Sequence, residues 1–289
     1  MIQGKISVII PARNERFLQK TIDDILTKAR EDVEVIAVLD GYDPELKFDP
    51  RLKIIRNEKS IGMRQCINAG VAISEGEYIL KSDAHIMYDE GFDVKLKADC
   101  LDNWVVVPRR YKLEPEEWTF RDPGHMPVDY EYISFPNDPN DFGGPGLHGR
   151  RWRERTRERY DDPQYQIDDL MTFQGSCWFM KRSYFDFLEL MDHENYGSFA
   201  HEAQEICLKA WLSGGRVVTN KKTWYAHLHK GKKYGRGYSL SENTRKKGTE
   251  YTNRWMKNEA WHKQKLPFSW LIQKFSPVPG WAENWEELV

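Results

Sequence analysis

Asp83 and His85 stand one residue apart, directly after an apolar stretch that is typical of a buried strand. Because alternate strand residues share a face, the carboxylate and the imidazole point to the same side. Such an oxygen and nitrogen pair suits Mn²⁺ and similar ions, which also accept phosphate oxygens. His227 and His229 alternate in a second strand-like stretch. One of them could supply a third ligand, or both could be packed or surface residues, and Asp83 could instead cap a turn.

Three more carboxylates have positions that could serve chemistry. Glu202 and Glu205 lie one helical turn apart, so they either hold sugar or acceptor hydroxyls or form a solvated helix face. Asp40 ends an apolar stretch before Gly41, where it could cap a turn or bind a base or ribose. The chain has no glycine fingerprint for dinucleotides and no P-loop, so a metal-bridged diphosphate is the remaining phosphate ligand.

Strands and helices alternate in the elements that must position these residues. We expect strands at 5–11, 33–39, 52–56 and 77–81, and helices at 17–29 and 61–74. This order predicts an α/β fold with a mostly parallel, Rossmann-like sheet and helices on both faces. Ligands of such sheets bind beyond the carboxyl ends of the strands, where both Asp40 and Asp83 fall.

The second half of the chain is less regular. We expect ordered structure at 170–180, helices near 184–191 and 201–213, and a strand at 216–219. The stretch 114–169 is rich in Pro, Gly, Asp and Arg, and we interpret it as a lid or an acceptor-binding insertion. After His227 the chain is basic and aromatic, and we expect it to lie across the sheet edge.

Composition indicates one large domain with local patches of charge. The 289 residues carry a net charge of −2, which does not mark a nucleic-acid binder. From Arg150 to Arg159, however, six Arg oppose two Glu. The four cysteines lack metal-site spacing, so we expect buried free thiols and a reducing compartment. Without an apolar run of ~20 residues or a signal region, we expect a bacterial or phage-infected host cytoplasm.

Several ordered motifs resemble one family of enzymes. SVIIPARNE at 7–15 and VIAVLDG at 35–41 resemble the nucleotide-binding half of GT-A glycosyltransferases of the family 2 type. Ser82-Asp83-Ala84-His85 resembles the Asp-x-His motif of polypeptide N-acetylgalactosaminyltransferases. FAHEAQEICLKAWLSGG at 199–215 resembles their WGGENxE helix, and His227-Leu228-His229-Lys230 resembles their His-x-x-Arg. The resemblance covers roughly 5–257 except 114–169, and it departs where Ala200-His201 replaces two glycines and Lys230 replaces an arginine.

The resemblance implies a division of the chain and a set of site residues. It predicts a GT-A catalytic domain at 1–230, with a nucleotide-binding half at 1–110, an insertion or acceptor loop at 111–169 and an acceptor and metal half at 170–230. A basic, aromatic lid and C-terminal extension then occupies 231–289. The predicted metal ligands are Asp83, His85 and His227, and the predicted catalytic residues are Glu202, Glu205 and Lys230. The predicted donor contacts are Pro11, Ala12, Arg13, Glu15, Asp40, Gly62, Arg64, Ser82, Lys230 and Arg236.

The predicted function is metal-dependent transfer of a hexose or pentose from a UDP-sugar, with retained anomeric configuration and Mn²⁺ or Mg²⁺ on the diphosphate. The acceptor could be a hydroxylated base in DNA, which the Arg-rich stretch around Trp152 and the basic C-terminal third favour. A cell-surface glycan, a protein or a lipid-linked precursor are alternatives. So are a non-catalytic nucleotide-sugar-binding module and a nucleotidyltransferase. We expect 230–241 to form a lid over the donor.

Overall fold

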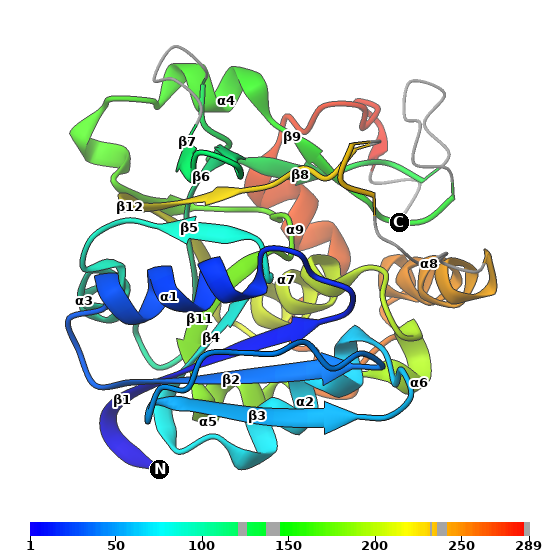
Figure 1. The fold of residues 1–289 in the computed structure, drawn as a ribbon. Coiled ribbons are helices and arrows are strands. Elements are labelled where there is room, and N and C mark those ends of the chain that lie inside the picture. Colours follow the sequence, from blue (N-terminus) through cyan, green and yellow to red (C-terminus); the bar gives the residue numbers. More distant parts are fainter. Residues whose placement is uncertain (121–125, 137–144, 232, 236–241, 286–289) are drawn as a thin grey trace.

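A ten-stranded sheet runs through the residues that the computed structural model describes, which are 1–120, 126–136, 145–231, 233–235 and 242–285 (Figure 1). The strands follow the order β10-β12-β6-β11-β4-β1-β2-β3, and β5 pairs with β12 while β7 pairs with β6. Two further strands, β8 and β9, form a separate hairpin. The strand bounds are β1 Ile2–Ala12, β2 Val33–Asp40, β3 Leu52–Asn57, β4 Gly76–Ser82, β5 Ile86–Tyr88, β6 Trp104–Glu114, β7 Thr119–Phe120, β8 Glu131–Ile133, β9 Gly149–Arg151, β10 Ile167–Asp169, β11 Cys177–Lys181 and β12 Arg216–His227.

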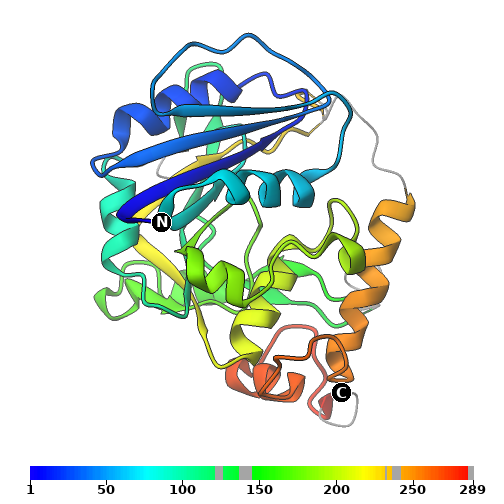
Figure 2. The same cartoon turned by 90° about the horizontal axis from the view of Figure 1, so that it is seen from below.

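Helices cover both faces of this sheet, as Figures 1 and 2 show together. The helix bounds are α1 Leu18–Lys28, α2 Met63–Ile73, α3 Phe92–Ala98, α4 Arg153–Glu158, α5 Arg182–Phe187, α6 His193–Tyr196, α7 Glu202–Leu212, α8 Glu242–Met256 and α9 Phe268–Phe275, with a short 3-10 turn at Pro163–Tyr165. The predicted α/β class with a mostly parallel sheet is confirmed, because β1 pairs in parallel with both β2 and β4, and β2 pairs in parallel with β3.

The two faces arise from the alternation of side chains along the buried strands. In β1, Ile6, Val8 and Ile10 belong to the apolar cluster that contains the buried residues of α1. Ile9, between them in sequence, belongs to the cluster that contains the buried residues of α2 on the opposite face. Both sets are fully buried, which explains why the strand has a continuous apolar sequence. The parallel strands end together at one edge, and that edge is where Asp40 and Asp83 lie.

The stretch that we interpreted as an insertion holds short elements within its described residues. β6 continues to Glu114, so the predicted boundary between 110 and 111 falls inside a strand. Beyond it, Glu131 of β8 pairs with Arg151 of β9, and an isolated bridge links Glu131 to Thr172. The hairpin thereby sits beside the second half of the chain, and α4 follows it directly.

The described part of the C-terminal segment packs mainly on helices, although Lys274 of α9 reaches Asp169 of the edge strand β10 at 2.7 Å, and a course across the sheet edge stays a prediction. α8 contacts α6 and α7, and α9 contacts α7 and α8 (Figure 2). Trp255 and Phe268 are fully buried in the same apolar cluster as Ile9 and Trp178. The physical reason is that the segment carries an apolar helical face among its basic residues, and that face must be buried. The division at 230 and 231 stays a prediction.

Two predictions from composition can be compared with the described residues. All four cysteines are free and buried, which confirms the predicted buried thiols. No helix in the described ranges has the length and apolar character that crossing a membrane requires. The compartment stays a prediction.

We predict that Phe268→Ala lowers the free energy of unfolding by about 3–5 kcal/mol, because it empties a fully buried site between α9 and the rest of the core. Phe48→Ala is the matched control, since that ring is 91% exposed and its loss should change stability by less than about 0.5 kcal/mol. Denaturant titration measures both variants. Equal stabilities for the two would show that α9 does not belong to the cooperative core.

Candidate active site

A cavity of about 930 Å³ opens at the carboxyl ends of the parallel strands. Its walls come from both halves of the chain: from the end of β1, from the loop after β4, from the start of α7 and from the end of β12. Several predicted site residues line it, namely Pro11, Ala12, Arg13, Glu15, Asp40, Gly62, Asp83, His85, Glu202, His227 and Lys230.

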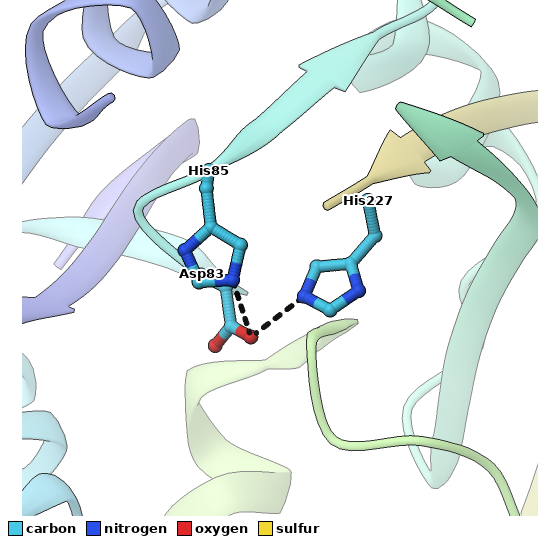
Figure 3. A group of neighbouring side chains, drawn as sticks. All are labelled: Asp83, His85 and His227. Atoms are coloured by element: carbon cyan, nitrogen blue, oxygen red, sulfur yellow. Dashed lines mark hydrogen bonds and ion pairs between the residues drawn. The ribbon is translucent and has the colours of Figure 1, made fainter. Parts of the chain in front are cut away.

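Asp83, His85 and His227 converge in this cavity (Figure 3). Their potential ligand atoms all lie within 4.8 Å of one another. His227 Nε2 lies 3.1 Å from Asp83 Oδ2, and His85 Nε2 lies 3.9 Å from the same oxygen. The structure thus brings together the three residues that the sequence predicted as one metal site.

Strand pairing brings His227 to the other two residues. β12 pairs antiparallel with β5, and His227 stands opposite Ile86, the residue after His85. The amide of Leu228 donates to the carbonyl of His85, at 3.2 Å. The predicted strand at 216–219 was too short, because β12 passes through a polar irregularity between Asn220 and Trp224 before it reaches His227.

Lys81 is a cavity-lining residue that the sequence analysis did not single out. It is fully buried in β4, and its ammonium lies 2.6 Å from Asp83 Oδ1 and 3.5 Å from Glu202 Oε2. It also donates to the carbonyl of Gly175, at 2.6 Å. Burial by itself would raise the pKa of Asp83, but Lys81 and the two imidazoles hold that pKa well below its usual range. The available signal was a lysine at an inward position of an otherwise apolar strand.

Glu202 is buried at the start of α7, against the cavity. Its Oε1 accepts a hydrogen bond from Trp178 Nε1 at 2.7 Å. Burial raises the pKa of Glu202, although Lys81 and the indole partly offset that effect. Gly175 faces this carboxylate so closely that a Cβ there would stand 2.7 Å from Oε2. The carboxylate is therefore fixed in place between a strand and a loop.

Glu15 links a predicted metal ligand to the segment after β12. Its Oε2 lies 3.1 Å from His85 Nδ1, and its Oε1 accepts from Lys230 Nζ at 2.6 Å. Burial opposes ionisation, but His85 and Lys230 together lower the pKa of Glu15. Since Nδ1 of His85 faces this carboxylate, Nε2 is the nitrogen that faces Asp83.

Asp40 uses both of its oxygens within the chain while it lines the cavity. They accept from Ser60 Oγ at 2.6 Å, from the Ile61 amide at 2.6 Å and from the Gly62 amide at 3.2 Å. Gly62 has a positive φ of 91°, and a Cβ there would stand 2.6 Å from Ser198 Cβ. The structure thus contains the contacts expected if Asp40 caps a turn. The other interpretation, in which Asp40 contacts a base or ribose, stays a prediction.

Three other predicted residues do not line the cavity. Arg64 and Glu205 are both fully buried and form an ion pair with each other. Glu205 also accepts from Lys209 Nζ at 2.8 Å, so it joins α7 to its surroundings. Ser82 is buried, and its hydroxyl donates to the carbonyl of Asp83 at 2.9 Å. Arg236, a predicted donor contact, lies outside the described residues.

His201 stands where the resembling family has a glycine, and it has a left-handed φ of 59°. Its Nδ1 lies 3.1 Å from the carbonyl of Leu147, so Nδ1 must donate. Its Nε2 lies 3.1 Å from Thr249 Oγ1 of α8 and therefore accepts. Burial, together with the neighbouring His148, lowers the pKa of His201 to about 3. The neutral ring thus ties the start of α7 to α8.

The donor set of the convergent residues fits a divalent transition ion. One carboxylate oxygen and two imidazole nitrogens are ligands that Mn²⁺ and related ions accept. Burial lowers the pKa of His227 to about 3, so this imidazole is neutral at pH 7 and keeps a lone pair available to a metal. The residues present are therefore compatible with a bound ion.

The parallel strands end at a cavity lined by acidic and imidazole groups, which is where ligands bind in open α/β sheets. The chain belongs to glycosyl transferase family 2, because the family model matches residues 7–188, well over half of the chain.

Curated relatives support this family. The chain is 25% identical over 241 residues to a putative polypeptide N-acetylgalactosaminyltransferase 13 of Drosophila melanogaster, a match that covers 75% of this chain and 40% of that protein. It is 30% identical over 126 residues to the glycosyltransferase GlyG of Streptococcus pneumoniae, covering 40% of this chain and 42% of that protein. The chain thus spans less than half of the length of either relative.

Two solved structures share the fold. GalNAc-T7, crystallised with UDP, GalNAc and Mn²⁺, has a TM-score of 0.65 at 16% identity, covering 89% of this chain and 49% of that one. Residues 1–349 of TarS from S. aureus, in complex with UDP-GlcNAc, have a TM-score of 0.52 at 15% identity, covering 83% of this chain and 63% of that one. These likenesses confirm the predicted GT-A fold.

We predict that His201→Asn makes stability less dependent on pH. The pKa of His201 is lowered in the fold, so below about pH 6.5 the unfolded chain binds a proton that the folded chain does not. The wild type should therefore lose about 1.4 kcal/mol per pH unit at this site as the pH falls from about 6 to 4. Unfolding titrations across that range measure the slope, and His262→Asn, whose side chain is 68% exposed, should leave it unchanged. Identical slopes for wild type and His201→Asn would contradict the neutral buried ring.

Proposed function

We propose that the chain transfers a sugar from a UDP-sugar to an acceptor hydroxyl, with retained anomeric configuration and a divalent ion, Mn²⁺ or Mg²⁺. The observation that carries the proposal is the convergence of Asp83, His85 and His227 within 4.8 Å inside the cavity. GalNAc-T7 was crystallised with UDP and Mn²⁺, and TarS with UDP-GlcNAc, which supports the same donor class here.

The proposed roles of the chain's own residues follow from their contacts. Asp83, His85 and His227 would hold the ion, which when bound neutralises charge on the departing diphosphate. Lys230 lies at the cavity wall and would add a positive charge toward the same phosphates. Glu15 holds this ammonium at 2.6 Å, so the cation is already positioned before the donor binds.

Glu202 is proposed as a positioning carboxylate for the donor sugar or the acceptor. It lines the cavity, and Trp178 and Lys81 fix its two oxygens. Glu205 has no part in this proposal, because it is enclosed by Arg64 and Lys209 away from the cavity. A retaining transfer can leave the acceptor proton to the departing phosphate, so no protein base is assigned.

For the acceptor we propose a hydroxylated base in DNA, supported by the arginine-rich stretch at 150–159, which follows the cavity-lining Gly149 and whose Arg151 contacts His229 of the cavity wall. The alternative is a hydroxyl on a protein or a cell-surface glycan, which the similarity to a putative polypeptide N-acetylgalactosaminyltransferase favours. Transfer assays with hydroxymethylated DNA, a Ser/Thr peptide mixture and a glycan as acceptors separate these possibilities.

We predict that His85→Ala reduces release of UDP from a UDP-sugar by at least about 100-fold, because the ion loses one of its three protein ligands. His262→Ala is the control, since its side chain is 68% exposed and lies outside the cavity. Coupled detection of UDP, with added Mn²⁺ and with excess chelator, measures both. Full wild-type activity in chelator would refute the metal requirement.

We also predict that UDP binds more tightly than GDP, and that Asp40→Asn weakens UDP binding by roughly tenfold, as expected for the loss of charged hydrogen-bond acceptors. The reason is that Asp40 lines the cavity and holds the 60–62 loop at its wall, where we propose that the base binds. Asp43→Asn is the control, because its side chain is 67% exposed. Calorimetry with Mn²⁺ present measures the affinities, and equal binding of UDP and GDP would contradict the base assignment.

A further inference from the structure

A second cavity, of about 260 Å³, lies between the segment 126–128, the end of β9 and the helix α4. Its lining combines apolar and basic side chains. It is lined by Met126, Pro127, Val128, Arg151, Arg153, Thr156 and Arg157. We call it the arginine pocket. No carboxylate is among these lining residues.

The arginine pocket lies next to the main cavity, and the strand β9 contributes residues to both. Glu131 pairs directly with Arg151 across the β8–β9 hairpin, and Gly149 lies two residues before Arg151 in the same strand. Glu131 and Gly149 line the main cavity, whereas Arg151 lines the pocket. Arg151 also contacts His229 Nε2 at 3.4 Å, and His229 lines the main cavity. The two cavities are therefore neighbours, separated by Arg151 and His229.

Among the described residues, the positive charge of the pocket is largely uncompensated. Arg153 has no ion-pair partner in that part of the chain, and Arg157 only approaches Glu154 at 4.0 Å on the exposed face of α4. Glu131 is already engaged by Arg110 at 2.8 Å. Burial and the nearby Arg110 and Arg153 lower the pKa of Arg151, and Glu131 only partly offsets them. A bound anion would relieve this repulsion.

We propose that the arginine pocket binds a backbone phosphate of a nucleic-acid acceptor while the target base enters the main cavity. Arginine forks match phosphate oxygens, and the apolar lining offers a surface for the sugar carbons. A base and its phosphate are separated by a sugar, so a base in the main cavity needs an anion site at the cavity's rim. A polypeptide acceptor presents no such fixed anion. The inference rests on the proposed transfer to a base in DNA and names the residues that position that substrate.

The test compares two double variants that remove the same charge. Arg153→Gln/Arg157→Gln alters the pocket, and Lys47→Gln/Arg51→Gln removes two exposed cations near the start of β3, the edge strand at the other end of the sheet. The probe is a fluorescein-labelled single-stranded oligodeoxynucleotide with one hydroxymethylated pyrimidine, titrated by anisotropy at several salt concentrations. We expect the pocket variant to bind roughly tenfold more weakly, and its log K against log salt slope to fall in magnitude by about 0.7, for the loss of one phosphate contact. The control variant should keep the affinity and slope of the wild type.

Separate readouts distinguish this inference from the proposed function. UDP release without acceptor should be unchanged in the pocket variant, and so should transfer to a hydroxymethylated nucleoside that lacks phosphate. Equal salt slopes for the pocket variant and the wild type would overturn the proposal. So would a loss of transfer to the phosphate-free nucleoside that equals the loss of transfer to the oligonucleotide. Pocket-dependent binding of a polyol-phosphate polymer in place of DNA would overturn the nucleic-acid assignment. If the pocket variant loses salt slope while neither it nor the wild type releases UDP, the phosphate site would stand and the transferase proposal would be refuted.

Discussion

The buried ammonium of Lys81 is the interaction on which the site depends. It holds Asp83, at the end of a parallel strand, and Glu202, at the start of a helix from the second half of the chain. A fully buried charge must be paired, and here both partners are carboxylates that face the cavity. Removing Lys81 would leave two carboxylates close together without their shared cation. The same ion pairs therefore stabilise the junction of the two halves and set the charge of the cavity.

Around this cluster, a second set of contacts fixes the groups that would meet the donor. Glu15 engages His85 and Lys230, so one carboxylate orients an imidazole and a cation together. The loop at 60–62 is held by Asp40, and its Gly62 packs closely on Ser198, whose carbonyl accepts from the Arg64 amide at 3.3 Å. The two walls of the cavity that come from the first and second halves of the chain are thus in direct backbone contact, and neither can shift far without the other.

The first half of the fold could be predicted because its signals are local. Continuous apolar stretches indicated β1 and β2, and strand ends placed Asp40 and Asp83 at one edge. The long-range contacts were harder. β12 was predicted to stop at 219, since polar residues interrupt its pattern before His227. A register shift in the pairing with β6 accommodates those residues. Such a shift depends on the neighbouring strand, so the pattern of side chains along β12 alone does not predict it.

Sequence patterns do not separate residues whose position is decided by burial and not by residue type. Glu202 and Glu205 look equivalent in sequence, yet one lines the cavity and the other is enclosed by Arg64. Lys81 was missed because a lysine at the end of an apolar strand is usually a surface residue. His201 replaces a family glycine at a left-handed position, and its contact with Thr249 requires a helix that lies 48 residues away in sequence.

The position of β12 has a consequence for how the chain is made. β12 lies between β10 and β6 in the sheet, and it carries His227, which is 144 residues from Asp83. At about 5–20 residues per second, the ribosome needs roughly 7–29 s to synthesise that interval. During this time the nascent chain can pair β1, β2, β3 and β4, but β6 keeps an open edge and the Asp83 cluster has only the imidazole of His85. The emerging protein therefore exposes an open strand edge until β12, Arg216–His227, has been synthesised.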